Sequence, residues 1–160
     1  MPATGKQKSE WYAKGLRFEC TQCGNCCTGG PGYVAVSEDE GRAIAGVLGI
    51  GYDEFLRRYT RKEGMGRSLR EVLTERGHDC VFLDFDAQGH AICKVYQARP
   101  LQCRTFPWWP ENLKTEASWK RLAHSCPGID RGAFVPIEQI RIQRDAQAAD
   151  PGVTSHGPSR

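Results

Sequence analysis

The sequence predicts a small single domain of the α+β class, in which a cysteine-rich loop packs on a short antiparallel sheet with several short helices. Four of the eight cysteines fall within residues 20–27 (CTQCGNCC), which predicts the loop. The periodic segments that follow are short and alternate between strand and helix patterns, which predicts the mixed class. A chain of 160 residues can also bury a core of its own, since domains of this size bury roughly 68–70% of their unfolded surface.

The sequence divides into three parts. Residues 1–17 are predicted to be a polar lead-in, residues 18–147 the cysteine-cluster domain, and residues 148–160 a disordered tail. The N-terminus has no apolar segment typical of an export signal, and no run approaches the roughly 20 apolar residues of a membrane span. We therefore expect a cytoplasmic protein with no membrane partner.

Strand and helix patterns follow the loop in order. Residues 33–36 alternate apolar and small side chains and are a strand candidate. Ser37 and Glu40 form a capping box ahead of an apolar stripe at helical spacing, and that helix should end at Gly49. Asp53 is then expected to cap a second short helix.

A β-hairpin is predicted in the middle of the chain. Residues 62–68 (KEGMGRS) are expected to be a loop. The apolar segments 80–85 and 90–96 then flank the turn sequence DAQG and are expected to pair as antiparallel strands. Each strand carries one cysteine, and in one register Cys80 and Cys93 would face each other across the pair.

Short helices are predicted for the remainder of the chain. Pro100 suits the first turn of a helix that carries Cys103 and ends before Pro107. Residues 116–125 and 136–147 also have helical patterns. Because every element after the loop is short, the mixed class follows, with the loop packed on a small sheet.

The eight cysteines are predicted to bind metal. An even number of cysteines is also consistent with disulfide bonds in a secreted chain, but lasting disulfides are rare in the reducing cytosol expected here. Buried, unreactive thiols are the other alternative, although no packing requirement explains four thiols in one turn-rich loop. The candidate ligands are Cys20, Cys23, Cys26, Cys27, Cys80, Cys93, Cys103 and Cys126.

The spacing of the first cysteines favours iron over zinc. Cys20, Cys23 and Cys26 form C-x2-C-x2-C, the loop that ferredoxin-type chains place around a cluster, with a distal cysteine followed by proline. Cys126 precedes Pro127 and is a candidate for that distal ligand. Structural zinc sites more often use two separated C-x2-C knuckles, and this chain has no second one. We therefore expect an iron–sulfur cluster of the 4Fe–4S kind, with zinc as the alternative, in one site or two.

Charge and motifs limit the other functions. A net charge of +3 from 22 basic and 19 acidic residues gives no reason to expect a nucleic-acid partner. No G-x-G-x-x-G, P-loop or G-x-S-x-G motif is present. Arg99 and Arg104 flank Cys103 and either offset the charge of a thiolate-rich centre or make surface ion pairs. Trp108 and Trp109 either line a site for a protein partner or pack in the core.

Several segments closely resemble the YkgJ-type cysteine-cluster family, also called the CxxCxxCC zinc- or iron-chelating domain. They are residues 20–27, 80–83 (CVFL), 93–96 (CKVY), 99–107 (RPLQCRTFP) and 126–128 (CPG). The resemblance covers about residues 18–128, fills all eight family cysteine positions, and implies that all eight bind metal. The cysteine pattern itself predicts a metal-binding protein whose centre is structural or transfers electrons. Some members are named for similarity to flagellin lysine N-methylase, so a protein lysine N-methyltransferase-like enzyme is the alternative.

Overall fold

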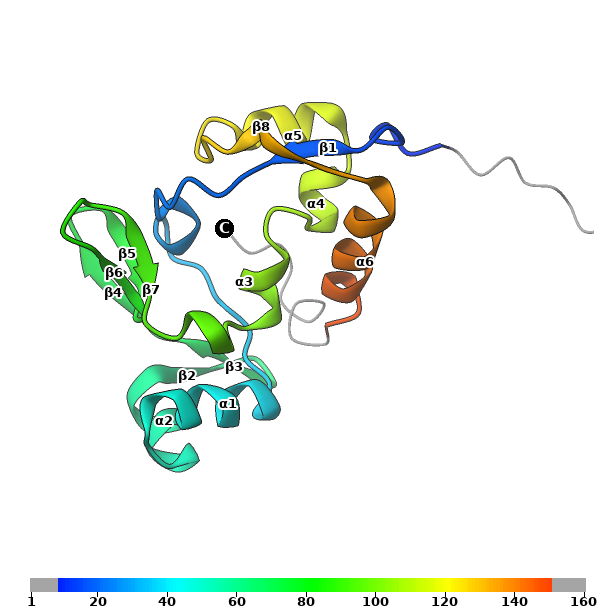
Figure 1. The fold of residues 1–160 in the computed structure, drawn as a ribbon. Coiled ribbons are helices and arrows are strands. Elements are labelled where there is room, and N and C mark those ends of the chain that lie inside the picture. The colour runs from blue at the N-terminus through cyan, green and yellow to red at the C-terminus, as the bar shows by residue number, and fades with distance from the viewer. Residues whose placement is uncertain (1–8, 151–160) are drawn as a thin grey trace, which may run out of the picture.

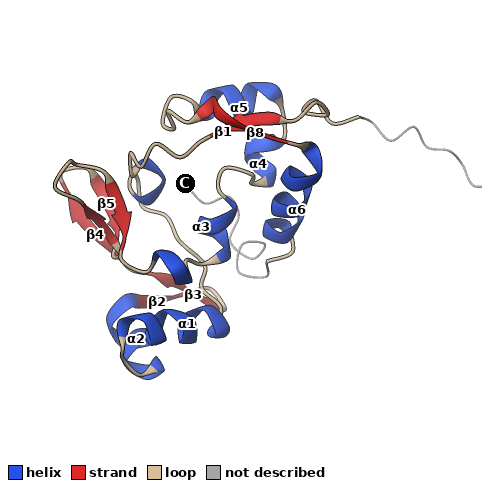
Figure 2. Cartoon of the chain, viewed as in Figure 1, coloured by secondary structure: helices blue, strands red, loops and turns tan. Residues whose placement is uncertain are grey.

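The computed structural model describes residues 9–150, and the predictions for residues 1–8 and for the tail from 151 to 160 lie outside this range. The expected α+β class is confirmed, because short helices are combined with antiparallel two-stranded sheets (Figure 1 and Figure 2). The paired strands are β1 with β8, β2 with β3, β4 with β5, and β6 with β7. Among the described residues, no helix is both long and apolar enough to cross a membrane.

The strands and helices are all short. The strands are β1 (Leu16–Phe18), β2 (Thr60–Glu63), β3 (Gly66–Leu69), β4 (Glu71–Thr74), β5 (Gly77–Cys80), β6 (Leu83–Phe85), β7 (Ala91–Cys93) and β8 (Ile129–Val135). The helices are α1 (Glu38–Leu48), α2 (Tyr52–Tyr59), α3 (Leu101–Thr105), α4 (Pro110–Leu113), α5 (Glu116–Leu122) and α6 (Ile137–Ala148). Two 3-10 turns, η1 (Asn25–Cys27) and η2 (Tyr96–Ala98), complete the order.

The first predicted helix is confirmed as α1. The Ser37 side chain accepts from the Glu40 backbone, and the Glu40 carboxylate accepts from the Ser37 backbone, which completes the capping box. The helix ends at Gly49 in the left-handed conformation that glycine adopts without strain. The predicted cap of α2 is wrong, because Gly51 is the N-cap and Asp53 lies in the first turn, where its charge complements the helix dipole.

Near the middle of the chain, one prediction is wrong and one is confirmed in shorter form. The expected loop over 62–68 is instead part of the β2–β3 hairpin, in which Thr60 pairs with Leu69 and Glu63 with Gly66. Its charged side chains hide the strand alternation, and residues 34–36 cover part of the outer edge of β3 through backbone hydrogen bonds with Arg67 and Leu69. The predicted hairpin over 80–96 is found in shorter form as β6–β7.

The cysteines of that hairpin do not pair across it. Cys93 lies opposite Leu83, whereas Cys80 ends the preceding strand β5 and lies opposite Glu71. The alternative in which the two thiols face each other in one strand pair is therefore wrong. The apolar segment over 80–85 changes partner after its first residue, which a periodicity argument cannot detect.

The predicted strand over 33–36 reduces to one bridge, between Ala35 and Ser68. Its backbone is hydrogen-bonded to β3 at Val34 and Val36, and to a buried side chain as well. The Ala35 amide donates to Gln102 Oε1, and Gln102 Nε2 donates to the Tyr33 carbonyl, each at 3.1 Å. This side chain links α3, which carries Cys103, to the extended segment that follows the cysteine loop.

The later helices agree with the sequence in outline. Pro100 is the N-cap of α3, and this helix ends before Pro107 as predicted. The pattern over 116–125 corresponds to the shorter α5, and the pattern over 136–147 to α6. The sequence did not predict α4 or the β1–β8 pair, whose strands lie more than one hundred residues apart in the chain.

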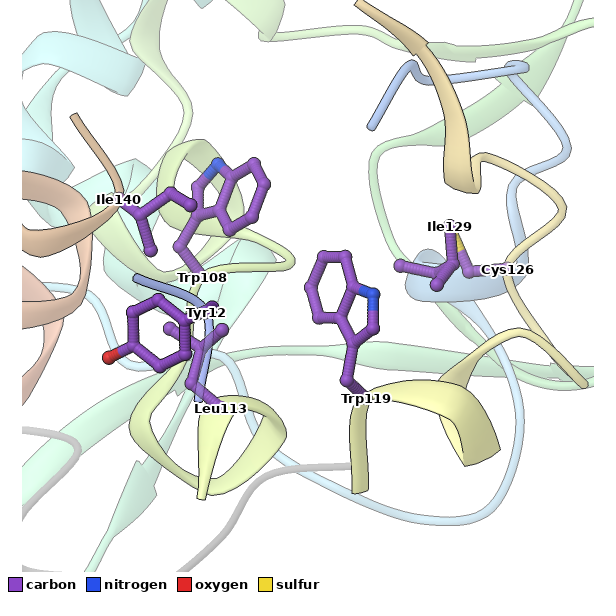
Figure 3. Packing of buried hydrophobic residues seen from close by; sticks show 7 residues of the cluster. All are labelled: Tyr12, Trp108, Leu113, Trp119, Cys126, Ile129 and Ile140. Carbon is purple, nitrogen blue, oxygen red and sulfur yellow. The ribbon is translucent and has the colours of Figure 1, made fainter. Parts of the chain in front are cut away.

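The described chain has two apolar cores. The first core contains Tyr12, Trp108, Leu113, Trp119, Cys126, Ile129 and Ile140. Trp108 and Trp119 stack with ring centroids 5.3 Å apart, and Figure 3 shows Cys126 beside Ile129. The two tryptophan rings therefore supply much of the apolar surface that holds β8 and α6 together.

The second core lies under the other sheets. It contains Ile44, Ala45, Phe55, Leu69, Phe82 and Val95, and the partly buried Cys80 and Cys93 pack against it. Cysteines thus belong to both cores, and α3 lies between them (Figure 1).

Phe55 tests the second core. Its side chain is fully buried, so Phe55→Ala should lower the free energy of unfolding by about 3–5 kcal/mol through lost burial and a cavity. Urea unfolding followed by circular dichroism measures the change. Met65→Ala is the control, because Met65 is fully exposed in the β2–β3 turn and its loss should change stability by less than about 0.5 kcal/mol. Equal effects of the two substitutions would contradict the assigned core.

Candidate metal centre

The cysteine loop runs between the two cores. In Figure 1 it continues from β1, forms the turn η1 and passes between the β1–β8 pair and the hairpins β4–β5 and β6–β7. Gly24 precedes η1 with φ at +78°, a left-handed conformation that favours glycine. The side chains of the loop therefore face both the first core and the second core.

The start of the loop is attached to the chain around Cys126. The Glu19 amide donates to the Gly128 carbonyl at 3.3 Å. The Asn25 side chain donates from Nδ2 to the Ser125 carbonyl at 2.8 Å. These two bonds lie on either side of Cys126, so they bring this distal thiol to the loop.

The end of the loop is attached to the chain before Cys80. Thr28 Oγ1 donates to Asp79 Oδ1 at 2.5 Å, and Arg76 pairs with the second oxygen of the same buried carboxylate. The Thr28 hydroxyl, opposed by burial and assisted by Arg76, holds the pKa of Asp79 below its usual range. Since Asp79 is adjacent to Cys80, this contact fixes the second distal thiol against the loop.

Two backbone hydrogen bonds add to this attachment. The Ala91 amide donates to the Gln22 carbonyl at 2.7 Å, two residues before Cys93. The His78 amide donates to the Gly29 carbonyl at 2.8 Å. The loop is thus bonded to β5 and β7, the strands that end in the two hairpin cysteines.

Cys103 is placed by the buried polar side chains of its own helix. Gln102 bonds to the extended segment over 33–35, as described above. Thr105 Oγ1 and Gln147 Oε1 are 3.0 Å apart, and both side chains are buried. Helix α3 is therefore held from both sides, since buried polar groups are costly unless they are bonded.

The cysteines gather around two cavities that share part of their walls. The first, which we call the loop cavity, has a volume of about 480 Å³ and is lined by Cys20, Cys23, Cys26 and Cys126. The second, the hairpin cavity, has a volume of about 610 Å³ and is lined by Cys20, Cys26, Cys27, Cys80, Cys93 and Cys103. Because Cys20 and Cys26 line both, the structure brings all eight predicted residues to one connected region.

The thiols form no disulfide bonds, and they gather in one region without forming a complete metal-binding site. None of the eight cysteines is in a disulfide bond, and the sulfurs of Cys26 and Cys27 lie 3.8 Å apart. Across residues 9–150, no three His, Cys, Asp or Glu side chains are close enough together to hold one metal ion as placed. The amides of Gln22 and Asn25 approach the sulfurs of Cys20 and Cys23 at 3.4 and 3.5 Å. Such N–H groups stabilise a thiolate once a metal replaces the proton.

Most of these thiols hold their protons tightly without metal. Burial raises the pKa of Cys80 to about 11, from an ordinary value of 9.0. Burial likewise raises the pKa of three other thiols, Cys93, Cys103 and Cys126. The pKa of Cys26 is raised first by its hydrogen bond with Cys27 and then by burial. A metal that binds here must displace these protons, which thiophilic metals do and hard cations do not.

Glycine permits the loop to approach its neighbours closely. A Cβ at Gly128 would collide with the carbonyl oxygen of Glu19. Gly77 has φ at +122°, and a Cβ there would lie 2.5 Å from the carbonyl oxygen of Gly29. These contacts, and the bond of Thr28 to Asp79, were not predicted from the sequence. The only local signal is that each lies within three residues of a cysteine.

Comparisons with known proteins agree with this donor set. The family model described as "CxxCxxCC: Putative zinc- or iron-chelating domain" matches residues 19–127. The chain is 38% identical over 104 residues to an uncharacterized protein of Methanocaldococcus jannaschii, covering 64% of this chain and 51% of that protein. The chain thus spans about half the length of this curated relative. No solved structure matches.

Gly128 tests the attachment of the loop. Gly128→Ala should displace Glu19 and separate Cys20 from Cys126, which lowers the melting temperature and increases alkylation of Cys126 under native conditions. Gly46→Ala is the matched control, because Gly46 lies in α1 with open space around its Cα and alanine favours helix. Peptide mass spectrometry after a short pulse of iodoacetamide measures the difference. Equal labelling of Cys126 in both variants would count against the close approach.

The raised pKa of Cys80 predicts a pH dependence of the metal-free protein. The folded chain keeps this proton up to about pH 11 and the unfolded chain only up to about 9, so stability should fall as pH rises through this interval. Urea unfolding of reduced, chelator-treated protein at pH 8, 9 and 10 measures the slope. Cys80→Ser should make the fall shallower, because serine does not ionise there. A free energy of unfolding that rose with pH would contradict the assignment.

Proposed function

Because this chain belongs to the CxxCxxCC family of zinc- or iron-chelating domains, we propose that its eight cysteines hold iron–sulfur centres of the 4Fe–4S kind. The observation that carries the proposal is the attachment of the C-x2-C-x2-C loop, by hydrogen bonds, to residues adjoining Cys80, Cys93 and Cys126. Thiols distant in the sequence are thereby held around shared cavities.

The first ligand set is the one that lines the loop cavity. Cys20, Cys23 and Cys26 come from the C-x2-C-x2-C loop, and Cys126 is the distal cysteine followed by proline. This is the three-plus-one arrangement of ferredoxin-type clusters. The agreement between spacing and cavity lining supports a cluster at this position.

The second ligand set comprises the remaining thiols. Cys27, Cys80, Cys93 and Cys103 all line the hairpin cavity, and none of them lines the loop cavity. Four thiolates are the number that a second centre requires. We therefore assign two centres, one to each cavity.

The separation of the thiols supports a cluster over a single zinc ion. Four sulfurs bound to one zinc at about 2.3 Å lie about 3.8 Å from one another. The sulfurs of Cys26 and Cys27 lie at this distance, but no three donors in the described chain approach that arrangement. A cluster joins sulfurs that are farther apart, and cavities of about 480 and 610 Å³ have room for it.

The position of the centres suggests their role. They would cross-link the first core, through Cys126, to the second core, through Cys80 and Cys93, so that metal binding contributes folding free energy. When bound, such a cluster can also accept and donate one electron, and thiolate centres of this kind belong in a reducing compartment such as the cytoplasm. We do not extend the proposal to methyl transfer, since no observation of the fold favours it.

Metal and sulfide analysis tests the proposal. Protein purified without oxygen should be brown and contain about eight iron and eight sulfide per chain, four of each per centre. Cys23→Ala and Cys93→Ala are matched variants, since each cysteine lines one cavity only, and each should remove about half of both elements. Complete loss of iron in either variant would indicate one shared centre. Colourless protein with stoichiometric zinc would refute the cluster.

A further inference from the structure

A third cavity adjoins the thiols and is lined differently. It has a volume of about 440 Å³, and we call it the arginine pocket because Arg99 and Arg104 lie on its wall. Three thiols also reach it, those of Cys20, Cys26 and Cys103. The other walls are mainly apolar and come from Phe18, Tyr96, Phe106, Trp108, Val135 and Ile142. A cavity of this size and lining is typical of sites for small molecules.

Neither arginine has an acidic partner in the described part of the chain. Arg99 donates from Nε to the Tyr96 carbonyl at 3.1 Å, and its guanidinium carbon lies 3.9 Å from the centre of the Tyr96 ring. Arg104 donates from Nε to the Arg99 carbonyl at 3.0 Å. These bonds orient both side chains but use only Nε. Within residues 9–150 the terminal nitrogens of both side chains make no further hydrogen bond or ion pair, and Arg104 is exposed, so these nitrogens are open to an anion from solvent.

The two arginines differ in what they face. Arg99 lines both the arginine pocket and the hairpin cavity, so its positive charge also lies near the thiols of the hairpin cavity. Arg104 lines the arginine pocket and neither of the thiol-rich cavities. Arg99 thus borders both the hairpin cavity and the arginine pocket, whereas Arg104 borders the arginine pocket alone, beside Cys20, Cys26 and Cys103.

We propose that the arginine pocket binds a small organic anion, in which a carboxylate or phosphate group is joined to an apolar body. The planar guanidinium group matches both oxyanions with paired N–H donors. The aromatic and aliphatic walls accept the apolar body, and Cys20, Cys26 and Cys103 place the bound molecule beside the thiol centre. The inference does not depend on which metal the cysteines hold.

Isothermal titration calorimetry with the full, metal-loaded chain tests the pocket. The probes are 3-phenylpropionate for a carboxylate, phenyl phosphate for a phosphate, and neutral 3-phenyl-1-propanol as the uncharged analogue. At least one anionic probe should bind saturably and at least tenfold more tightly than the alcohol, because a hydrogen bond to a charged group is worth about 1.5–3 kcal/mol. Whichever anion binds more tightly identifies the headgroup.

Substitutions locate the binding. Arg104→Gln should weaken the bound anion at least tenfold, while Arg131→Gln on the exposed part of β8 should leave its affinity unchanged. Iron content and circular dichroism should match the wild type in both variants, which separates loss of the pocket from loss of the metal centre. Absence of saturable binding by both anions at millimolar concentration would overturn the proposal. Equal affinity in Arg104→Gln and wild type, or equal affinity for the alcohol, would overturn it too.

Discussion

The structure depends on the close approach of one loop to segments distant in the chain. Residues 19–29 form hydrogen bonds with the backbone or side chains of residues near Cys80, Cys93 and Cys126. Gly77 and Gly128 leave room for this close contact. Neither apolar core contains all the cysteines. Hydrogen bonds with the loop, together with packing of Cys80, Cys93 and Cys126 on the two cores, therefore determine where the thiols meet.

This arrangement relates folding to the chemistry of the thiols. Without metal, burial keeps several of the sulfurs protonated, and the loop is held mainly by a few hydrogen bonds, each worth about 0.5–1.5 kcal/mol. Replacement of the protons by metal would add metal–sulfur bonds across the junction of the two cores to these weak hydrogen bonds. The fold thus provides an approximate arrangement of donors, and the metal would complete it.

Local signals in the sequence predicted the elements that depend on neighbouring residues. The capping box of Ser37 and Glu40, the helix after Pro100 and the turn between β6 and β7 all follow from short patterns. The β1–β8 pair and the contact of Thr28 with Asp79 depend on residues far apart in the chain, which a single sequence does not reveal. The charged β2–β3 hairpin lacks the apolar alternation that would have marked it. The eight candidate ligands were identifiable from spacing and family resemblance, but their division between two cavities required the fold.

In the proposed protein, thiolates from separate segments share an inorganic centre at the junction of the two cores. X-ray absorption spectroscopy at the metal edge of anaerobically purified protein tests this most directly, since it reports the atoms bound to the metal. We expect a first shell made only of sulfur around iron, with a second shell of iron from the same cluster. A first shell dominated by nitrogen or oxygen would contradict the account.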